Sequence, residues 1–381
     1  MDSKIDYSAL YQLITKVYSV PGKLLKGWSL PPLQVFIEVT YQCNLRCDFC
    51  QFIISQGPHK PEQRSIHGPE EISIAEIRQI INDIPATAVV SFTGGEPFVK
   101  KGFVDVLEYA SRRNKSHIYT NGTKIDEHMA KHLAELGARN FLTPGLVLVG
   151  VSLEGLRDTH NQIAQRSWAF DKTIGGIEAL IRERDRLGRT LPLVELKTVI
   201  SPRNAGELYE VYLLARDLDV DIFNIMAMNL LPHASRFNKI APPSPLMRPP
   251  SVDNVDAQLL HEQLEMIQAD ALSRPIQIRT TPFGFDLAEM VNYYNQGRPL
   301  HEYRCHYPWF GLGVSAYGDL SICPYAVIGN TREGRLSKLF NNATARAFRQ
   351  SLAKAKLFPG CWGCCMLVPA GPRKEGISED D

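Results

Sequence analysis

The stretch VTYQCNLRCDFCQF, residues 39–52, places three cysteines within eight positions: Cys43, Cys47 and Cys50. The next cysteine along the chain is Cys305. Three soft thiolates so close together suit zinc, Cu(I) or an iron–sulfur cluster. Structural zinc takes four ligands, whereas this stretch offers three. A cubane cluster held by three cysteines would leave one iron open, and an open iron can bind and activate a substrate.

Strands and helices alternate around and after the cysteine stretch. Apolar and β-branched runs predict strands over residues 34–40, 88–92, 117–120, 146–153, 193–200 and 220–228. Helical spacing predicts helices over residues 73–84, 103–113, 125–137, 170–188 and 205–218, with Ser73 as an N-cap of the first. This alternation predicts parallel strands joined by right-handed crossovers. An open doubly wound sheet and a barrel both fit the pattern. Six strands are too few for a closed eight-stranded barrel, so we expect an α/β fold with a partial (β/α)6 barrel.

Distinctive polar residues come directly after four of the predicted strands. Cys43 follows the first, Gly94 the second, Asn121 the third and Glu154 the fourth. The carboxyl ends of parallel strands lie at one edge of the sheet, where functional loops gather in both architectures. We therefore expect these four loops to meet.

These motifs together resemble the signature of the radical S-adenosylmethionine (SAM) superfamily. The similarity covers roughly residues 34–230 and consists of Cys43-x3-Cys47-x2-Cys50 with Phe49 before the last cysteine, Gly94-Gly95-Glu96-Pro97, Thr120-Asn121-Gly122 and Ser152-Leu153-Glu154-Gly155. The resemblance implies a [4Fe–4S] cluster on the three cysteines, whose open iron chelates the amino and carboxylate groups of SAM. It also implies reductive cleavage to a 5′-deoxyadenosyl radical, which removes a hydrogen atom from an unactivated C–H bond.

The resemblance, with the residue types, nominates a set of SAM contacts: Phe49, Gly94, Gly95, Glu96, Pro97, Asn121, Ser152, Glu154 and Lys197. The glycine pair lets the backbone come close to the ligand, and Glu96 can accept a hydrogen bond from the methionine ammonium. Ser152 and Glu154, two apart on a predicted strand, are expected to share one face. Lys197 is expected to meet the carboxylate of SAM. The structural alternatives are a tight Gly-Gly turn, helix capping, an ordinary ion pair for Lys197 and, for Asn121, an Asn-Gly turn.

A second group of cysteines lies near the carboxyl end. The spacing Cys305-x12-Gly318-x4-Cys323, followed by Cys361-x2-Cys364, resembles the SPASM/twitch extensions that hold auxiliary [4Fe–4S] clusters. A hairpin is predicted over residues 312–325 between the first two of them.

The cysteine count sets the number of auxiliary clusters. Two fully ligated clusters need about eight cysteines, and five occur here. We therefore predict one auxiliary cluster on Cys305, Cys323, Cys361 and Cys364, with structural zinc as the alternative. The roles open to Cys365 are inert packing, a substitute ligand, or a hydrogen donor to a product radical.

The predicted organisation has five parts. They are an amino-terminal helical extension (1–33), the partial radical SAM barrel (34–230), a proline-rich linker (231–252), a small α+β cysteine-rich twitch/SPASM-like extension (253–366) and a disordered tail (367–381). Residues 7–30 fit a helix that closes the core better than a membrane-surface segment.

Composition restricts location and partners. The 381-residue chain carries 42 Lys and Arg against 41 Asp and Glu, so no net field favours nucleic acid. Its beginning, MDSKIDYSAL, has no signal-peptide pattern, and no run reaches about 18 apolar residues. The cytoplasm is the expected location, where cysteines stay reduced and serve as metal ligands.

The expected function is oxidative modification of a small molecule, such as a natural product, a sugar or a lipid-like compound. The auxiliary cluster would accept an electron, and flavodoxin or ferredoxin would supply the first one. The thirty-odd residues before the first strand are too few for a peptide-recognition domain, which favours a small molecule. The alternative is a peptide maturase that forms thioethers or C–C crosslinks or epimerises residues. The rival class is a non-catalytic iron–sulfur protein for electron transfer or redox sensing.

Overall fold

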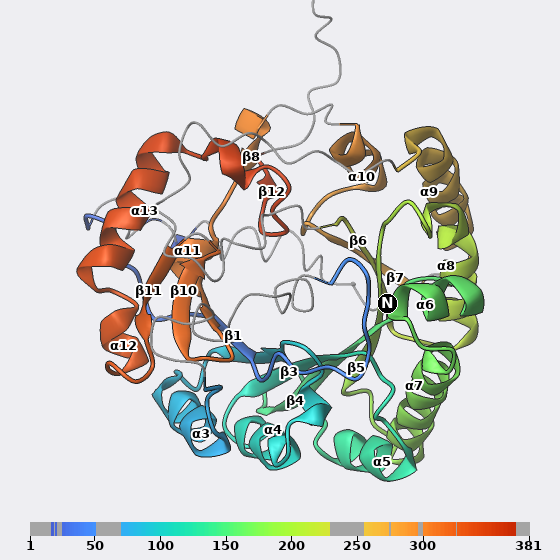
Figure 1. The fold of residues 1–381 in the computed structure, drawn as a ribbon, viewed down its shortest axis with the longest axis horizontal. Helices are drawn as coiled ribbons and strands as arrows, with labels where there is room; N and C mark the ends of the chain where they lie inside the picture. Colours follow the sequence, from blue (N-terminus) through green and yellow to red (C-terminus); the bar gives the residue numbers. More distant parts are fainter. Residues whose placement is uncertain are drawn as a thin grey trace, which may run out of the picture.

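The computed structural model describes residues 25–50, 70–228, 255–273, 276–295, 300–324 and 326–370, with three single residues nearer the amino terminus. A ten-stranded sheet runs through these residues in the order β11-β10-β9-β1-β2-β3-β4-β5-β6-β7. Figure 1 shows the sheet curving inside an incomplete ring of helices. The arrangement is the mixed α/β, barrel-like fold that the alternating pattern predicts.

All six predicted strands and five helices of the barrel are confirmed. In chain order the elements are β1 (Gln34–Glu38), α3 (Ile74–Asp83), β2 (Val89–Thr93), α4 (Phe103–Ser111), β3 (Lys115–Thr120), α5 (Glu127–Glu135), β4 (Gly145–Ser152), α6 (Arg157–Ala164), α7 (Ala169–Arg186), β5 (Leu193–Val199), α8 (Leu208–Asp217) and β6 (Ile222–Met226). The six strands pair in parallel from β1 to β6. Ser73 caps α3 through a capping box with Glu76, as its position indicated. Helix α6 was not predicted, because its eight residues are mostly polar.

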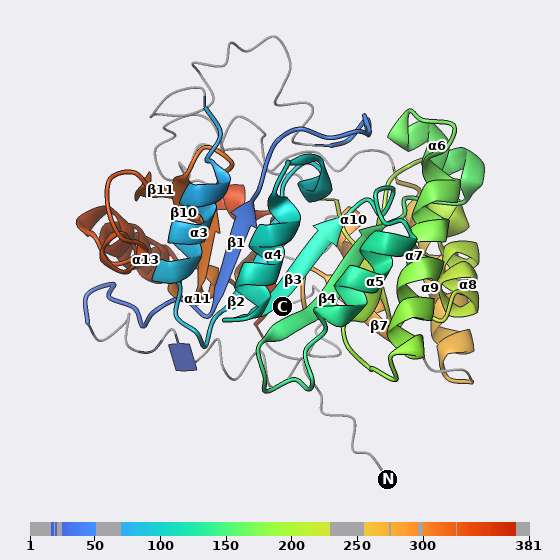
Figure 2. The ribbon, with the colours of Figure 1, turned by 90° about the horizontal axis from the view of Figure 1, so that it is seen from below.

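The core lies between the sheet and the helices on its outer face. Strand β4 reads GLVLVGVS and is buried on both faces. Helix α3 buries Ile77, Ile80 and Ile81, which recur at helical spacing. Figure 2 shows α3, α4, α5 and α7 side by side along this outer face. The other face of the strands is enclosed by the curve of the sheet, and we call it the inner face.

The sheet continues beyond the six predicted barrel strands at both edges. The added elements are α9 (Ala257–Ala271), β7 (Gln277–Thr281), α10 (Leu287–Tyr294), β8 (Tyr303–Arg304), α11 (Tyr307–Phe310), β9 (Gly311–Val314), β10 (Asp319–Cys323), β11 (Ala326–Asn330), α12 (Leu336–Leu339), α13 (Ala343–Ala355) and β12 (Val368–Pro369). Strand β7 pairs in parallel with β6, and β9 pairs in parallel with β1. The predicted hairpin is confirmed as β9 and β10. The cysteine-rich extension is therefore hydrogen-bonded directly to the first barrel strand.

Three expectations lie wholly or largely outside the described residues. They concern the helix within residues 7–30, the linker 231–252 and most of the disordered tail predicted over residues 367–381. The predicted start of that tail is wrong: Leu367 is buried and β12 pairs with β8, so residues 367–370 belong to the cysteine-rich extension. Among the described helices, none combines the length and the apolar character needed to span a bilayer.

Candidate functional site

The first cysteine loop follows β1 and is held by its backbone from two sides. On one side it bonds to the β2 segment, and on the other to the end of the unpredicted helix α6. These bonds are Val39 N to Thr93 O (2.8 Å), Gly95 N to Thr40 O (2.7 Å), Glu96 N to Gln42 O (2.8 Å), Arg46 N to Ala164 O (3.1 Å) and Asp48 N to Ile163 O (3.2 Å). The loop is therefore fixed at both ends before any ligand binds.

Gly94 and Gly95 are required by the closeness of this loop. A Cβ on Gly94 would lie 2.4 Å from the carbonyl oxygen of Thr40, and Gly94 has φ +126°. A Cβ on Gly95 would lie 2.2 Å from the carbonyl oxygen of Gln42. The structure shows that both glycines approach the backbone that carries Cys43, and their predicted close approach to a ligand stays a prediction.

The three thiols lie on one loop and are partly buried. The backbone N–H of Leu45 donates to Cys43 Sγ (3.4 Å), and Asn121 Nδ2 lies 3.8 Å from the same sulfur. Burial raises the pKa of Cys43, and burial with the nearby Glu154 raises the pKa of Cys47. Bound metal would reverse this effect by stabilising the thiolates. Three soft donors with N–H···S support fit a cluster that keeps one iron open.

Glu96 and Asn121 connect the second and third loops to the cysteines. Glu96 is fully buried, and its carboxylate accepts hydrogen bonds from Phe98 N (3.1 Å), Thr120 Oγ1 (2.9 Å) and Asn121 N (2.8 Å). Burial raises the pKa of Glu96 to about 7, against the effect of these bonds. Asn121 forms the expected turn through Thr123 N (3.0 Å), and its amide also reaches the first cysteine.

Ser152, Glu154 and Lys197 lie around the ends of β4 and β5. Ser152 is directly opposite Lys197 in the parallel register. Strand β4 ends at Ser152, so the prediction that Ser152 and Glu154 share a strand face is wrong: Glu154 lies past the end of the strand. Its carboxylate accepts from Val199 N (2.8 Å), and burial raises its pKa to about 7.

The remaining predicted SAM contacts lie in the same region. Burial lowers the pKa of Lys197, whose Nζ lies 4.0 Å from the centre of the Tyr119 ring. Pro97 is buried and begins a short 3-10 turn directly after Glu96. Phe49 is half-buried on the cysteine loop between Cys47 and Cys50. The four loops predicted to meet therefore do lie together.

Glu71 is a positioning residue that no sequence motif marks. Its carboxylate accepts from Tyr41 N (2.7 Å) and Thr40 Oγ1 (2.8 Å), and Lys100 Nζ lies 3.2 Å away. These bonds fix the backbone between β1 and Cys43. No local motif marks such a residue, because its partners lie about thirty positions away on either side.

Replacing Glu71 with alanine is expected to lower the free energy of unfolding by about 1–3 kcal/mol, because the N–H of Tyr41 loses its partner. It should also speed the loss of iron from the first cluster to a chelator. The matched control is Glu70→Ala, which removes an exposed carboxylate one position away. Equal rates of iron release from the two variants would contradict the role of Glu71.

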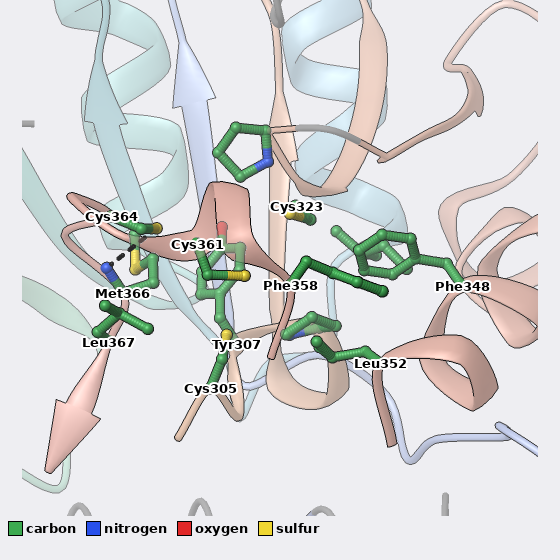
Figure 3. A pocket seen from close by; sticks show the side chains of 13 residues that line it. Cys305, Tyr307, Cys323, Phe348, Leu352, Phe358, Cys361, Cys364, Met366 and Leu367 are labelled. Carbon is green, nitrogen blue, oxygen red and sulfur yellow. Dashed lines mark hydrogen bonds between the residues drawn. The ribbon is translucent and has the colours of Figure 1, made fainter. Parts of the chain in front are cut away.

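The second group of cysteines surrounds a cavity beneath the hairpin. Cys305, Cys323, Cys361 and Cys364 line it together with apolar side chains that include Tyr307. Figure 3 shows the first three of these cysteines gathered at the cavity and Cys364 beside them. They come from the β8–α11 connection, the end of β10 and one tight turn. Burial, then the nearby Cys323 and Cys361, raise the pKa of Cys305.

The thiol spacing suits a cubane in this cavity. Within the described ranges, no three His, Cys, Asp or Glu side chains converge closely enough to share a single metal ion. A cubane puts each thiolate on a different iron, so its ligands need not converge on one point. Backbone support recurs here, since the N–H of Met366 donates to Cys364 Sγ (3.5 Å).

Cys365 directly follows Cys364 at the end of this turn. It is hydrogen-bonded to Cys364, which is the main cause of the raised pKa of Cys364, and it is absent from the residues that line the cavity. Its thiol is also near enough to raise the pKa of Lys197. Cys365 is therefore near both Cys305 of the auxiliary cavity and Lys197 of β5.

Two family models match the chain. Residues 37–192 match the Radical SAM superfamily, and residues 305–365 match SPASM, an iron-sulfur cluster-binding domain. The two matches coincide with the two cysteine sites. They imply a [4Fe–4S] cluster, auxiliary iron–sulfur binding and SAM.

Individual relatives agree with this assignment. Fe-coproporphyrin III synthase of Methanosarcina barkeri is 29% identical over 51% of this chain, which spans only 43% of that protein's length. The tungsten-containing aldehyde ferredoxin oxidoreductase cofactor-modifying protein of Pyrococcus furiosus is 25% identical, and the match covers 87% of both chains. Streptococcus suis SuiB bound to SAM superposes with a TM-score of 0.60 at 15% identity, over 92% of this chain and 75% of SuiB. SuiB has also been solved with its precursor peptide SuiA.

Proposed function

We propose that this chain, which belongs to the radical SAM superfamily and carries a SPASM iron–sulfur domain, is an enzyme that cleaves SAM reductively and oxidatively modifies a small-molecule substrate. The observation that carries the proposal is the pairing of β9 with β1. This pairing joins the strand that precedes Cys43 to the hairpin that ends at Cys323, so that one sheet connects the two thiol sets.

The residues around the first site divide into ligands and supports. Cys43, Cys47 and Cys50 would hold the cluster, and Lys197 opposite Ser152 would meet the SAM carboxylate. When bound, the cluster and SAM supply a 5′-deoxyadenosyl radical that removes a hydrogen atom from a C–H bond. The remaining predicted contacts, Phe49, Gly94, Gly95, Glu96, Pro97, Asn121 and Glu154, would shape the pocket and keep water out.

The auxiliary site would complete an oxidation. Four thiols of the cavity would close the coordination of a second cluster, which leaves it to exchange electrons rather than bind substrate. Flavodoxin or ferredoxin is proposed as the external donor to the first cluster.

The small-molecule assignment is supported by the relative that matches along most of its length, which is named for cofactor modification. The relative named Fe-coproporphyrin III synthase points the same way. The second candidate is a peptide maturase, suggested by the SuiB complex with its precursor peptide. That likeness concerns the fold, but relatives named sporulation killing factor maturation protein SkfB and mycofactocin maturase MftC, 26% and 27% identical over about half of this chain, also support the peptide candidate. The small-molecule proposal is preferred because the relative named for cofactor modification matches over 87% of both chains.

The test is SAM cleavage by anaerobically reconstituted protein reduced with dithionite. We expect 5′-deoxyadenosine by liquid chromatography and about eight irons with matching sulfide per chain, as two four-iron clusters require. About four irons plus zinc would support a structural zinc site instead. Fully loaded protein that makes no 5′-deoxyadenosine would overturn the enzymatic proposal in favour of an electron-transfer protein.

The substrate class can be tested with the same preparation. Addition of a protein-free small-molecule extract should raise the rate of 5′-deoxyadenosine formation above the rate with SAM alone. A peptide fraction depleted of small molecules should not. The reverse pattern would replace the small-molecule proposal with the peptide maturase.

A further inference from the structure

A polar network covers the inner face of β5, β6 and β7. Lys197, Asn224 and Arg279 lie side by side in the parallel register of these strands. Their sequence neighbours Leu196, Phe223 and Ile225 belong to the core on the helix side. Alternation along a strand therefore turns the polar residues to the inner face.

Four side chains of this network fix one another in a hydrogen-bonded series. Thr281 Oγ1 donates to Asn224 Oδ1 (3.1 Å), and Asn224 Nδ2 donates to Glu195 Oε1 (3.1 Å). Arg279 Nη1 donates to the same carboxylate oxygen (2.8 Å). Glu195 is buried, with a side-chain exposure of 1%. A buried acid held by an amide thus anchors the guanidinium on one side.

Among the residues that the structure describes, no hydrogen-bond partner occupies the other side of the Arg279 guanidinium. Its side chain is 30% exposed, and its hydrogen bonds to other described residues use Nη1 alone. The Nε and Nη2 donors form the edge that matches a carboxylate in two parallel bonds. A flexible surface arginine would have to be ordered on binding, whereas this one is already fixed by Glu195.

The surroundings suit a bound anion. Burial, and then the nearby Arg279, lower the pKa of Lys197, whereas the buried carboxylate of Glu195 acts in the opposite direction. His117, on the same inner face, is kept neutral because burial lowers its pKa to about 3. Gly150 lets Tyr119 and Lys197 pack closely over β4, since a Cβ there would lie 2.6 Å from Tyr119 Cδ1 and 3.0 Å from Lys197 Cδ.

We propose that Arg279, positioned by Glu195 and Asn224, binds a carboxylate group of the substrate on the inner face of the barrel. The proposal rests on the proposed function and narrows its substrate class to carboxylate-bearing small molecules. Lys197 is still proposed to bind the carboxylate of SAM. The two cations would therefore bind two different anions, one on SAM and one on the substrate. The alternative is an ion pair that serves only stability.

The probe is butyrate, with butyramide as its neutral isostere, titrated into reconstituted SAM-loaded holoenzyme and followed by saturation-transfer NMR. A ligand of this size binds in the millimolar range at best. We expect butyrate to bind wild type, butyramide to bind at least about tenfold more weakly, and Arg279→Gln to weaken butyrate binding by at least about tenfold. The butyrate affinity of Arg279→Lys should fall between those of wild type and Arg279→Gln, because lysine keeps the positive charge but lacks the two parallel N–H donors of the guanidinium.

The matched control is Arg216→Gln on α8. Arg216 is also a partly buried arginine, 23% exposed, whose Nη1 lies 2.8 Å from Asp270. The Arg216→Gln variant should lose about as much thermal stability as Arg279→Gln, and it should bind butyrate as tightly as wild type does. Equal butyrate binding by wild type and both Arg279 variants, equal binding of butyramide, or no butyrate binding to wild type would each overturn the proposal.

The outcome is independent of the test of catalysis. Failure of wild type to make 5′-deoxyadenosine would overturn the proposed function and leave the binding result standing. Wild-type SAM cleavage together with Arg279-independent butyrate binding would overturn only the substrate subsite.

Discussion

Replacing Cys47 with alanine is expected to lower 5′-deoxyadenosine formation at least about 10³-fold, equivalent to about 4 kcal/mol of transition-state stabilisation. Cys47 lies on the loop with Cys43 and Cys50, and two thiolates cannot hold a cubane in place of three. The variant should also lose about four irons per chain while the auxiliary cluster stays loaded. The measurement is iron and sulfide analysis beside chromatographic quantitation of 5′-deoxyadenosine.

The control for this experiment is Asp48→Ala, one position along the same loop. Asp48 forms a partly exposed ion pair with Arg203 (3.0 Å), and its backbone bond to α6 survives the substitution. Such a pair contributes up to about 1 kcal/mol, so cluster content and activity should stay near wild type. A Cys47→Ala protein with about eight irons and undiminished cleavage would remove Cys47 from the ligand set.

Gly95→Ala is expected to lower SAM cleavage at least about 10²-fold without touching any ligand, because a shift of about 1 Å in a catalytic group has that effect. The added methyl would lie 2.2 Å from the carbonyl oxygen of Gln42, directly before Cys43. A clash with backbone cannot be relieved by side-chain rotation, so the cysteine loop must move. Iron content of the first site should fall together with activity.

Gly175→Ala is the matched control, because nothing lies within 4 Å of a Cβ at this position in helix α7. Alanine in a helix interior is favoured over glycine by about 1 kcal/mol, so this variant should melt at or slightly above the wild-type temperature. Full cluster loading and wild-type cleavage by Gly95→Ala would contradict the role given to the glycine pair.

The sequence predicted most of the local structure of the barrel. The periodicity of strands and helices is a pattern of residues that are close together in the chain. The sequence therefore predicted β1 to β6 and the five expected helices near their observed bounds. Helix α6 escaped because a short polar helix has little periodic apolar signal. Strand β4 ends before Glu154, since apolar composition alone does not mark where strand pairing stops.

The sequence predicted only those residues of the candidate site that belong to a recognisable motif. The cysteines, Gly94, Gly95 and Glu96 carry recognisable spacing, and the structure brings them together. Glu71 and Arg279 carry none, because each acts through partners far along the chain. Glu195 lies two residues before Lys197 on the predicted fifth strand. Its role in positioning a cation depends on Arg279 from β7, a strand that the sequence analysis did not place in the barrel.

The sequence by itself determined the alternating parallel fold and the two cysteine sets, because side-chain period and motif spacing are local properties. The tertiary structure decided how the sets relate. Strand β9 pairs with the open edge of β1, nearly three hundred residues away in the chain, and this pairing brings the auxiliary cavity to the barrel. Which free edge accepts which strand depends on the whole folded sheet, since unpaired backbone groups must find partners wherever the fold leaves them.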